Sequence, residues 1–468
     1  MTNRKNRLAF TILAIIQATL IFTISLIMIP LPKIASEFTL GSSQVLLLQV
    51  AYGLPFSGLL LFGGRLADRY RGRRMFVIGL IVFGASSLVA AFAPSFEVLL
   101  SMRFAQGIGG ALTAPAAMAV LRALFPDSMA FGRAMAIWGG VSVLGALVGF
   151  VASGILTTWM SWRWMFVVPI LVAIMGLAAT RGLLPAGDLE NTTRRPGLDP
   201  LGAILATLGI VFSSYGLVAA QDHSWASSVV WGPLTAGLVL LAAFLFVERR
   251  VRDPLLPPGF ILDRTRFTGM LGMLLAAASS ALIQFILSLY LQQLRNWSSF
   301  DTAVGFLPFA VTMIVANLAA PALVGRFGAR LVVVAGFILG AVGLGLLVGI
   351  DRDTAYASGL LPGQILLAAS MSLIFSGAAV LSTANVPQHQ AGLAGGVMNT
   401  SMELGPTVGL AILMSVASLQ ADVVRGYAWA FGTAGAVYLF AAVVAIMLTR
   451  RAPSGAGEPS SNSGTNSM

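Results

Sequence analysis

Two ionisable residues, Arg103 and Glu403, lie inside long runs of apolar residues. Glu403 stands near the middle of the run 392–418. A carboxyl group surrounded by hydrocarbon favours its neutral form, so it can bind and release a proton as water access changes sides. The alternative is that Glu403 acts only as a neutral hydrogen-bonding residue.

Arg103 begins a polar stripe that continues through Gln106, Gly110 and Thr113. Spacings of three and four residues place this stripe on one face of a helix. A charge within a membrane helix costs several kcal/mol and by default marks a functional residue that faces the protein interior. Because Arg103 is near one end of its run, the alternative is that its side chain reaches out to the membrane surface.

The composition places these residues in a membrane protein. The chain has 468 residues, of which 57% are hydrophobic and 10% are charged, whereas soluble domains carry about 25% charged residues. There are no cysteines, and His223 and His389 are far apart in the sequence. We therefore expect no zinc-type site and no cofactor. No nucleophile or metal-binding acid motif is found, so we do not expect an enzyme.

The apolar runs predict an all-α membrane protein with fourteen transmembrane helices, since each helix needs about 20 residues to cross a bilayer. The first run is too long for a signal peptide and is read as a retained helix. The predicted spans are 8–29, 43–63, 75–93, 97–121, 133–157, 163–181, 200–219, 229–247, 267–290, 302–324, 331–350, 358–383, 392–418 and 427–449.

The positive charges indicate the orientation of the helices. The net charge is +11, but the Lys and Arg residues stand in short loops, so they indicate topology and not nucleic-acid binding. Fourteen spans gather most of them on one side, which the positive-inside rule makes the cytoplasmic side, together with both termini. The tail 450–468 is rich in Ser and Gly and is predicted to be disordered.

An internal repeat divides the chain. Residues 132–149 and 392–409 share Gly, Ala, Leu, Gly, Val and Gly at identical offsets, and GGRLADRYRGRR after the second span is echoed by GRFGAR after the tenth. If spans seven and eight are an insertion, a 6+2+6 arrangement follows, as alternating access by two bundles requires. We predict an N-terminal bundle (1–183), a linker with two helices (184–266) and a C-terminal bundle (267–449).

Several stretches resemble the major facilitator superfamily, and within it the fourteen-helix drug:proton antiporters. They are LPKIASEF, GGRLADRYRGRR, RFAQGIGGALTAP, SWRWMF and GLAGGVMNTSMELGPTVG. The resemblance covers essentially the whole chain. It implies a monomeric, multi-pass protein of the bacterial cytoplasmic membrane that carries small organic molecules and is driven by the proton gradient. It also implies that Arg103 belongs to a proton-coupling motif, whereas relatives often have an uncharged amide at the position of Glu403.

The resemblance assigns a gating role to the loop that contains Gly64, Asp68, Arg69, Arg73 and Arg74. In the family a glycine lets helices close, and an acid pairs with Arg or with a helix end. The alternative is that these charges only orient the protein. The sequence departs from the family order, because Arg71 precedes Gly72, which puts the register of the turn in question.

Small residues in the repeat resemble the antiporter motif. They are Gly145 and Gly149 in the fifth span and Gly405, Pro406 and Gly409 in the thirteenth. Such residues let helices pack closely, so a structural role and a gating role are both open. The family often has an Asp in the first helix, where this sequence has Thr23. This weakens the case for a dedicated exporter of lipophilic cations.

Stripes of aromatic, Met and amide residues suit a large and mostly apolar cavity, although each stripe could instead be helix packing. The predicted cavity residues are Gln49, Tyr52, Phe56, Gln106, Gln284, Phe306, Phe309, Met313 and Asn399. The sequence therefore predicts a proton-coupled exporter of hydrophobic or amphiphilic compounds such as antibiotics, dyes or antiseptics. The alternative is a narrow-specificity carrier of a single metabolite, such as an anion.

Overall fold

The computed structural model is helical throughout the part of the chain that it describes, and that part contains no strand. The described residues are 2–27, 30–127, 129–138, 141, 145, 160–184, 197, 199–220, 227–251, 254–387 and 390–448. The side chain of Gln49, Gly149 and the tail 450–468 lie outside what is described.

The first helices form a group that we call the N-terminal bundle (α1, α4, α5, α6 and α8), with short helices between them. The elements are α1 (Thr2–Ser25), α2 (Leu31–Glu37), α3 (Ser42–Val50), α4 (Gly53–Tyr70), α5 (Gly72–Ala91), α6 (Phe96–Leu124), the 3-10 turn η1 (Trp162–Phe166) and α8 (Val167–Thr180). Residues 129–138 are also helical.

Two helices follow, α9 (Pro200–Ala219) and α10 (Ser228–Glu248), and then the group that we call the C-terminal bundle (α12 and α14–α18). The elements are α11 (Pro258–Leu262), α12 (Arg264–Leu289), η2 (Tyr290–Leu294), α13 (Ser299–Gly305), α14 (Leu307–Phe327), α15 (Ala329–Leu347), η3 (Tyr356–Leu360), α16 (Leu361–Ser382), α17 (Ala391–Ser418) and α18 (Val423–Leu448).

Twelve helices among the described residues are long and apolar enough to cross a membrane. The other two predicted spans differ for separate reasons. Span 43–63 falls on α3 and α4, which are separated at Ala51 and Tyr52, and α4 continues to Tyr70 with three charged side chains near its end. Span 133–157 falls mostly outside the described residues. The count of fourteen and the orientation of the termini therefore stay predictions.

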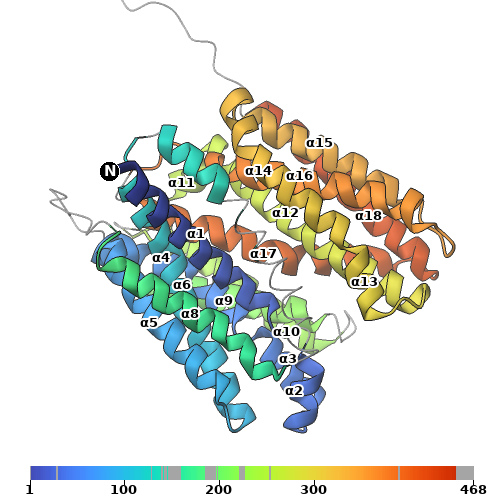
Figure 1. Cartoon of the computed structure of the whole chain (residues 1–468), viewed down its shortest axis with the longest axis horizontal. Helices are drawn as coiled ribbons and strands as arrows, with labels where there is room; N and C mark the ends of the chain where they lie inside the picture. The colour runs from blue at the N-terminus through green and yellow to red at the C-terminus, as the bar shows by residue number, and fades with distance from the viewer. Residues whose placement is uncertain are drawn as a thin grey trace, which may run out of the picture.

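Figure 1 shows the N-terminal bundle on one side of the molecule and the C-terminal bundle on the other, with α17 between them. Within the N-terminal bundle α6 packs on both α4 and α5, and within the C-terminal bundle α12 packs on both α16 and α17. Across the bundles α17 packs on α4 and α6. The predicted domain boundaries stay a prediction, but α6 and α17, which carry Arg103 and Glu403, meet directly.

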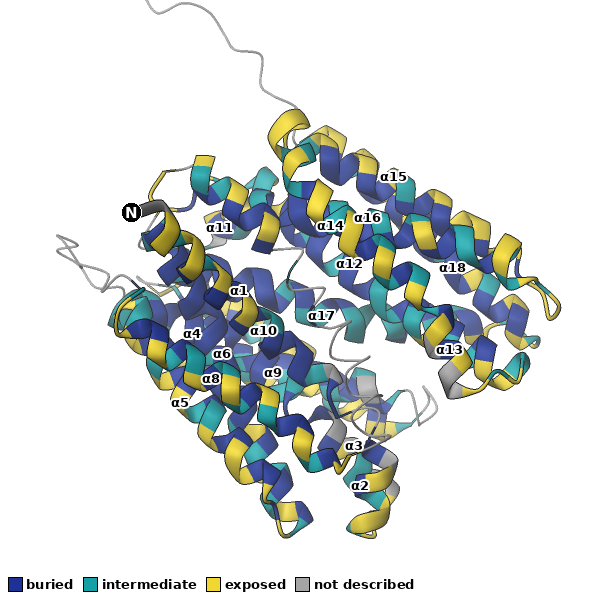
Figure 2. Cartoon of the chain, viewed as in Figure 1, coloured by how far each residue is buried: buried dark blue, intermediate teal, exposed yellow. Residues whose placement is uncertain are grey.

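Exposure follows the pattern expected of helices that face lipid. The outer helices α5, α8, α15 and α18 carry exposed apolar stripes, and α6 is largely buried (Figure 2). Leu171, Ile174, Leu318 and Phe440 are among the large exposed apolar side chains. In water such surfaces would cost free energy in proportion to their area, so they indicate contact with hydrocarbon.

Candidate transport site

Arg103 of α6 is completely buried. Its guanidinium donates hydrogen bonds to the carbonyl oxygen of Thr23 at 3.2 and 3.3 Å and to Oε1 of Gln106 at 2.9 Å. It also lies over the ring of Tyr52, 5.0 Å from the ring centroid, where cation–π attraction stabilises the charge. Its Nε has no hydrogen-bond partner among the described residues. Among the described residues, the groups that contact this positive charge are neutral dipoles and an aromatic ring.

Gln106 and Tyr52 extend the network around Arg103. Nε2 of Gln106 donates to the hydroxyl of Ser87 on α5 at 2.7 Å, and the hydroxyl of Tyr52 donates to the carbonyl oxygen of Leu20 on α1 at 2.9 Å. The network thus joins α1, α5 and α6 to the start of α4. Buried polar groups that are paired in this way fix the relative positions of the helices that carry them.

Glu403 stands on α17, a helix of the C-terminal bundle. Its carboxylate makes no hydrogen bond or ion pair with another described residue, but the charges of both Glu403 and Arg103 act on Tyr52. Tyr52 is buried in the N-terminal bundle, and Glu403 is partly buried. The charges of the two predicted ionisable residues therefore act on the same tyrosine.

Thr23 occupies the position where the family often has an acid, and it is fully buried. Its hydroxyl donates to the carbonyl oxygen of Thr19 at 2.7 Å, and its own carbonyl oxygen accepts from Arg103. An Asp here would place a carboxylate against the guanidinium. With Thr instead, Arg103 keeps its positive field, and Glu403 is the acid whose charge reaches the same tyrosine.

Two hydrogen bonds join the bundles at mid-depth. Nε2 of Gln17 on α1 donates to Oδ1 of Asn399 on α17 at 2.8 Å, and the hydroxyl of Ser376 on α16 donates to the carbonyl oxygen of Ala136 at 2.7 Å. Gln17 and Asn399 are both about 1% exposed. Asn399 was predicted to line the cavity, and here it bonds across the interface.

A second contact between the bundles lies at the end of α4, where α4 meets α5 and α17 begins. We call this the basic end, after the predicted gating loop. Oδ1 of Asp68 accepts a hydrogen bond from the N–H of Gly392 at 2.7 Å, and Oδ2 accepts from the N–H of Leu393 at 2.9 Å. The first N–H groups of a helix lack partners within it and carry partial positive charge, so a carboxylate is stabilised there.

Glycines allow α4 and α17 to come this close. A Cβ on Gly64 would lie 2.5 Å from the carbonyl oxygen of Gly392, and a Cβ on Gly396 would lie 2.6 Å from that of Leu60. The acid of the predicted gating loop bonds to a helix end, and the charge of Arg65 also acts on it. The basic end is closed at this contact.

The arginines of the gating loop are placed individually. Arg73 donates to the carbonyl oxygen of Thr180 at the end of α8, Arg69 lies beside the ring of Tyr70, and Arg74 is exposed. Arg71 has φ 69° and ψ 121° between α4 and α5, and Gly328 has φ 83° and ψ 150° between α14 and α15. Arg71 therefore occupies, at the turn of the N-terminal bundle, the positive-φ position that Gly328 occupies at the matching turn of the C-terminal bundle, a conformation that glycine adopts easily.

The glycines of the repeat pack on the first helix of each bundle. A Cβ on Gly145 would lie 2.3 Å from the carbonyl oxygen of Ala18 on α1, and a Cβ on Gly405 would lie 2.3 Å from that of Leu274 on α12. Gly409 packs on Ala278 in the same way. Pro406 follows Gly405 within α17. The predicted repeat therefore has matching contacts in both bundles.

The family model of the major facilitator superfamily matches residues 12–248 and 269–467. The chain belongs to the major facilitator superfamily. As a member of this superfamily it is a transporter and not an enzyme. The resemblance read from the sequence motifs is confirmed.

Its curated relatives in the superfamily are resistance and export proteins. It is 35% identical to "Puromycin resistance protein pur8" of Streptomyces alboniger over 93% of this chain and 90% of the relative. It is also 35% identical to "Cephamycin export protein CmcT" of Amycolatopsis lactamdurans, over 85% of this chain and 82% of the relative.

Solved structures of the superfamily share the fold. The human organic anion transporter MFSD10 (TETRAN) superposes with a TM-score of 0.66 at 17% identity, covering 95% of this chain and 99% of that one. The proton:xylose symporter XylE superposes with a TM-score of 0.65 at 14% identity, covering 94% and 95%. At these identities the likeness concerns the fold alone.

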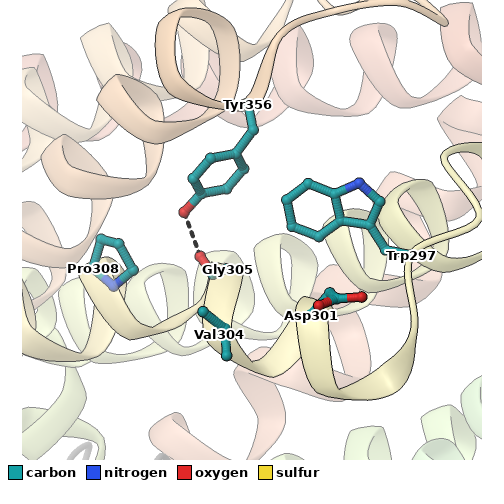
Figure 3. A pocket seen from close by; sticks show the side chains of 6 residues that line it. All are labelled: Trp297, Asp301, Val304, Gly305, Pro308 and Tyr356. Atoms are coloured by element: carbon teal, nitrogen blue, oxygen red, sulfur yellow. Dashed lines mark hydrogen bonds between the residues drawn. The ribbon is translucent and has the colours of Figure 1, made fainter.

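A pocket of about 460 Å³ lies in this major facilitator protein at the far end of the C-terminal bundle from the basic end. Its lining residues are Trp297, Asp301, Val304, Gly305, Pro308 and Tyr356. Figure 3 shows the hydroxyl of Tyr356 directed at the carbonyl oxygen of Gly305, to which it donates at 2.6 Å. None of the residues predicted to line the cavity contributes to this pocket.

Several predicted cavity residues are packed in the hydrophobic core. Tyr52 stacks on Phe56 with ring centroids 5.4 Å apart, and Phe309 and Met313 are buried in α14. Phe306 is partly buried and meets Phe309 edge to face, and Gln284 bonds back to Ser280 on its own helix. Whether these side chains meet a solute stays a proposal.

Sequence reasoning missed two features of this facilitator. Gln17 is a single amide in the first apolar span, and nothing in its neighbourhood marks it as a partner of Asn399. The acids Asp199 and Glu248, at the ends of the two inserted helices, stand beside loops rich in Arg and so suggest solvated surface charge. Both are less than 10% exposed. In each case the available signal in the sequence was a polar residue within an apolar span or next to one.

Proposed function

We propose that the protein is a proton-coupled antiporter that exports hydrophobic or amphiphilic organic compounds by alternating access. The observation that carries the proposal is that the charges of Glu403 on α17 and of the buried Arg103 on α6 both act on Tyr52, where the two bundles meet. The curated relatives, which are named for puromycin resistance and cephamycin export, support a solute of this class.

Alternating access supplies the role of each group. Glu403 binds a proton when its side of the interface is open to the outside and releases it when the interface opens to the cytoplasm. Arg103 supplies a fixed positive charge beside Tyr52, on which the charge of Glu403 also acts. The Asp68 contact with α17 holds the cytoplasmic side closed during proton loading. The protein acts as a monomer.

The positive-inside rule supports placing the basic end in the cytoplasm. The protein then lies in the cytoplasmic membrane of a bacterium with both termini inside. Fourteen spans are supported by the twelve apolar helices, by α3 and α4 at the second predicted span, and by helical residues at 133–138, Val141 and Gly145 in the fifth.

Efflux from proteoliposomes under an imposed pH gradient tests this function, with puromycin, a neutral dye and an amphiphilic cation as solutes. Glu403→Gln keeps the size and hydrogen bonding of the side chain but cannot ionise. We expect its rate of gradient-driven efflux to fall at least tenfold and its affinity for the solute to stay unchanged. The matched control Glu403→Asp keeps a titratable group and part of the coupling. Full gradient-driven efflux by Glu403→Gln would remove this acid from the mechanism.

The second candidate is a narrow-specificity carrier of one anionic metabolite. It is favoured by Arg103, which forms no ion pair with any described acid and has an unpaired Nε. Competition among the members of the solute panel distinguishes the two. A carrier of one anion is inhibited by that anion alone, whereas a drug exporter is inhibited by several unrelated compounds.

A further inference from the structure

The inserted helices contact both sides of the Asp68 contact. α9 packs on α4 and on α17, and α10 packs on α9. The hydroxyl of Thr207 on α9 donates to the carbonyl oxygen of Gly58 on α4 at 2.9 Å. A change in the position of α9 or α10 would therefore alter the contact between α4 and α17.

Two acids stand at the ends of these helices at the basic end. Asp199 precedes α9 and is 6% exposed, and Glu248 ends α10 and is 3% exposed. A Cβ on Gly202 would lie 2.4 Å from Oδ2 of Asp199 and 2.7 Å from Oε1 of Glu248. The two carboxyl groups thus converge over this glycine and lie within hydrogen-bonding reach of one another.

The hydrogen bonds of the pair leave a place for one proton. Oδ1 of Asp199 accepts from the N–H of Gly202 at 2.8 Å, and the two oxygens of Glu248 accept from the N–H groups of Leu255 at 3.1 Å and Leu256 at 2.9 Å. Oδ2 of Asp199 is buried and has no partner among the described residues. Two adjacent buried carboxylates repel each other, and a shared proton removes the repulsion and satisfies this oxygen.

Glu248 binds a short segment that packs against both α4 and α17. We call Leu255 and Leu256 the clasp; they are 0% and 8% exposed. They belong to one apolar cluster with Leu61 of α4 and with Leu393 and Ala394 of α17. The backbone N–H groups of the clasp bond to Glu248, so the ionisation of the carboxyl pair and the docking of the clasp depend on the same side chain.

The other charged groups near the pair either have partners of their own or are exposed. From α4, Nε of Arg65 donates to the carbonyl oxygen of Gly197, and its charge acts on Asp68. After α10, Arg249 and Arg250 are exposed, and in α12 Arg266 pairs with Asp263 at 3.9 Å. The first turn of α17 contains no acid. Arg252, Asp253 and His389 lie outside the described residues.

We propose that the carboxyl pair of Asp199 and Glu248 is a second proton-binding site, which docks the clasp on α4 and α17 while it shares one proton. When both groups ionise, their repulsion displaces Glu248, the clasp loses its hydrogen bonds, and the basic end loosens. The site is separate from Glu403. Its role in opening rests on the alternating access proposed above, but the proton-dependent docking of the clasp does not.

The chain has no cysteine, so one introduced thiol reports docking directly. The reporter is Leu256→Cys, and the control is Arg249→Cys on the adjacent exposed segment, which corrects for the ionisation of the thiol itself. The purified protein in nanodiscs is labelled with a maleimide between pH 6 and pH 9, without solute or gradient. We expect the ratio of reporter to control labelling rates to rise at least fivefold toward pH 9.

Asp199→Asn gives the decisive comparison, because its amide donates to Glu248 at every pH, as the shared proton does. In this background we expect the labelling ratio to stay low and independent of pH. Glu248→Gln also removes the pH dependence and serves if the first variant does not fold. A flat ratio in the unmodified background, or the same pH dependence in both variants, would overturn the proposal. Gradient-driven efflux is measured separately, so failure of the proposed function is recognised independently.

Discussion

The carboxylate of Asp68 caps the first turn of α17 through the N–H groups of Gly392 and Leu393. This bond joins residues more than 300 positions apart, and it lies beside the close approach of Gly64 to Gly392. A charge-assisted hydrogen bond of this kind contributes about 1.5–3 kcal/mol. A contribution of this size is large enough to decide whether the basic end is mostly closed or mostly open.

Asp68→Asn removes the charge but keeps the size of the side chain. We expect the ratio of closed to open molecules at the basic end to fall about tenfold, which corresponds to about 1.4 kcal/mol. Met118 of α6 is buried and would contact a Cβ on Gly395, so maleimide labelling of Met118→Cys measures the opening. The exposed Met129→Cys is the control site. Equal labelling rates with and without the Asp68→Asn substitution would show that the cap does not hold the bundles together.

Glycine substitutions should separate tight contacts from open ones. Gly405→Ala places a methyl group 2.3 Å from a backbone carbonyl oxygen, whereas Gly132 and Gly325 have nothing within 4 Å of the corresponding position. We expect Gly405→Ala to lower the free energy of unfolding by about 1–3 kcal/mol. Gly132→Ala and Gly325→Ala should be neutral or slightly stabilising, since alanine favours helix. Thermal unfolding in detergent compares them, and equal melting temperatures for all three variants would contradict the close approach.

The turn at Arg71 allows a test in the stabilising direction. Its positive φ costs an L-residue about 1–3 kcal/mol, so Arg71→Gly should raise the melting temperature and Arg71→Ala should not. Gly328→Ala at the matching turn should lower it. The comparison of Gly with Ala at position 71 removes the charge in both variants, so only the backbone differs. A higher melting temperature for the Ala variant than for the Gly variant would exclude strain as the cause.

A pH-dependent contact lies at the far end from the basic end. Glu37 accepts from Nε1 of Trp162 at 2.7 Å and pairs with Arg163 at 2.8 Å. The hydrogen bond from Trp162 first, and Arg163 next, lower the pKa of Glu37 below its ordinary value. A lowered pKa means that the stabilisation is present above about pH 4.3 and is lost as the pH falls through the folded-state pKa.

Glu37→Gln should therefore destabilise the protein at pH 7, by about 0.2–1 kcal/mol because the pair is partly exposed. At a pH below the lowered folded-state pKa, where Glu37 is protonated in the folded and the unfolded state, the variant and the unmodified protein should unfold at the same temperature. Asp353→Asn, an exposed acid in the loop 351–355, is the control. A stability difference that persists unchanged into acid would assign the effect to packing instead of charge.

The sequence predicted the superfamily, the apolar helices and the glycines that allow close packing, because these follow from hydropathy and from steric limits within short stretches. Glu403 and Arg103 could be singled out because a charge in an apolar run is rare. The cross-bundle partners could not be predicted: Gln17 with Asn399 and Asp68 with Gly392 depend on how two bundles are docked. The cavity prediction has the same limit, since an aromatic stripe such as Tyr52 and Phe56 has the same spacing whether it faces a solute or packs in the core.

The hydrogen bond between Gln17 and Asn399 spans 382 positions of the chain, and this separation constrains assembly of the protein. While the chain is being synthesised, α1 enters the membrane long before its partner exists, so the amide of Gln17 must first be satisfied by water, lipid headgroups or another helix. Contacts of such long range form late, because the entropy of closing the loop must be overcome first. The interface between the bundles is therefore completed only when the apolar run 392–418 has been inserted. A chain truncated before Ala391 would leave the polar side chain of Gln17 without its partner and so exposed to quality-control proteases.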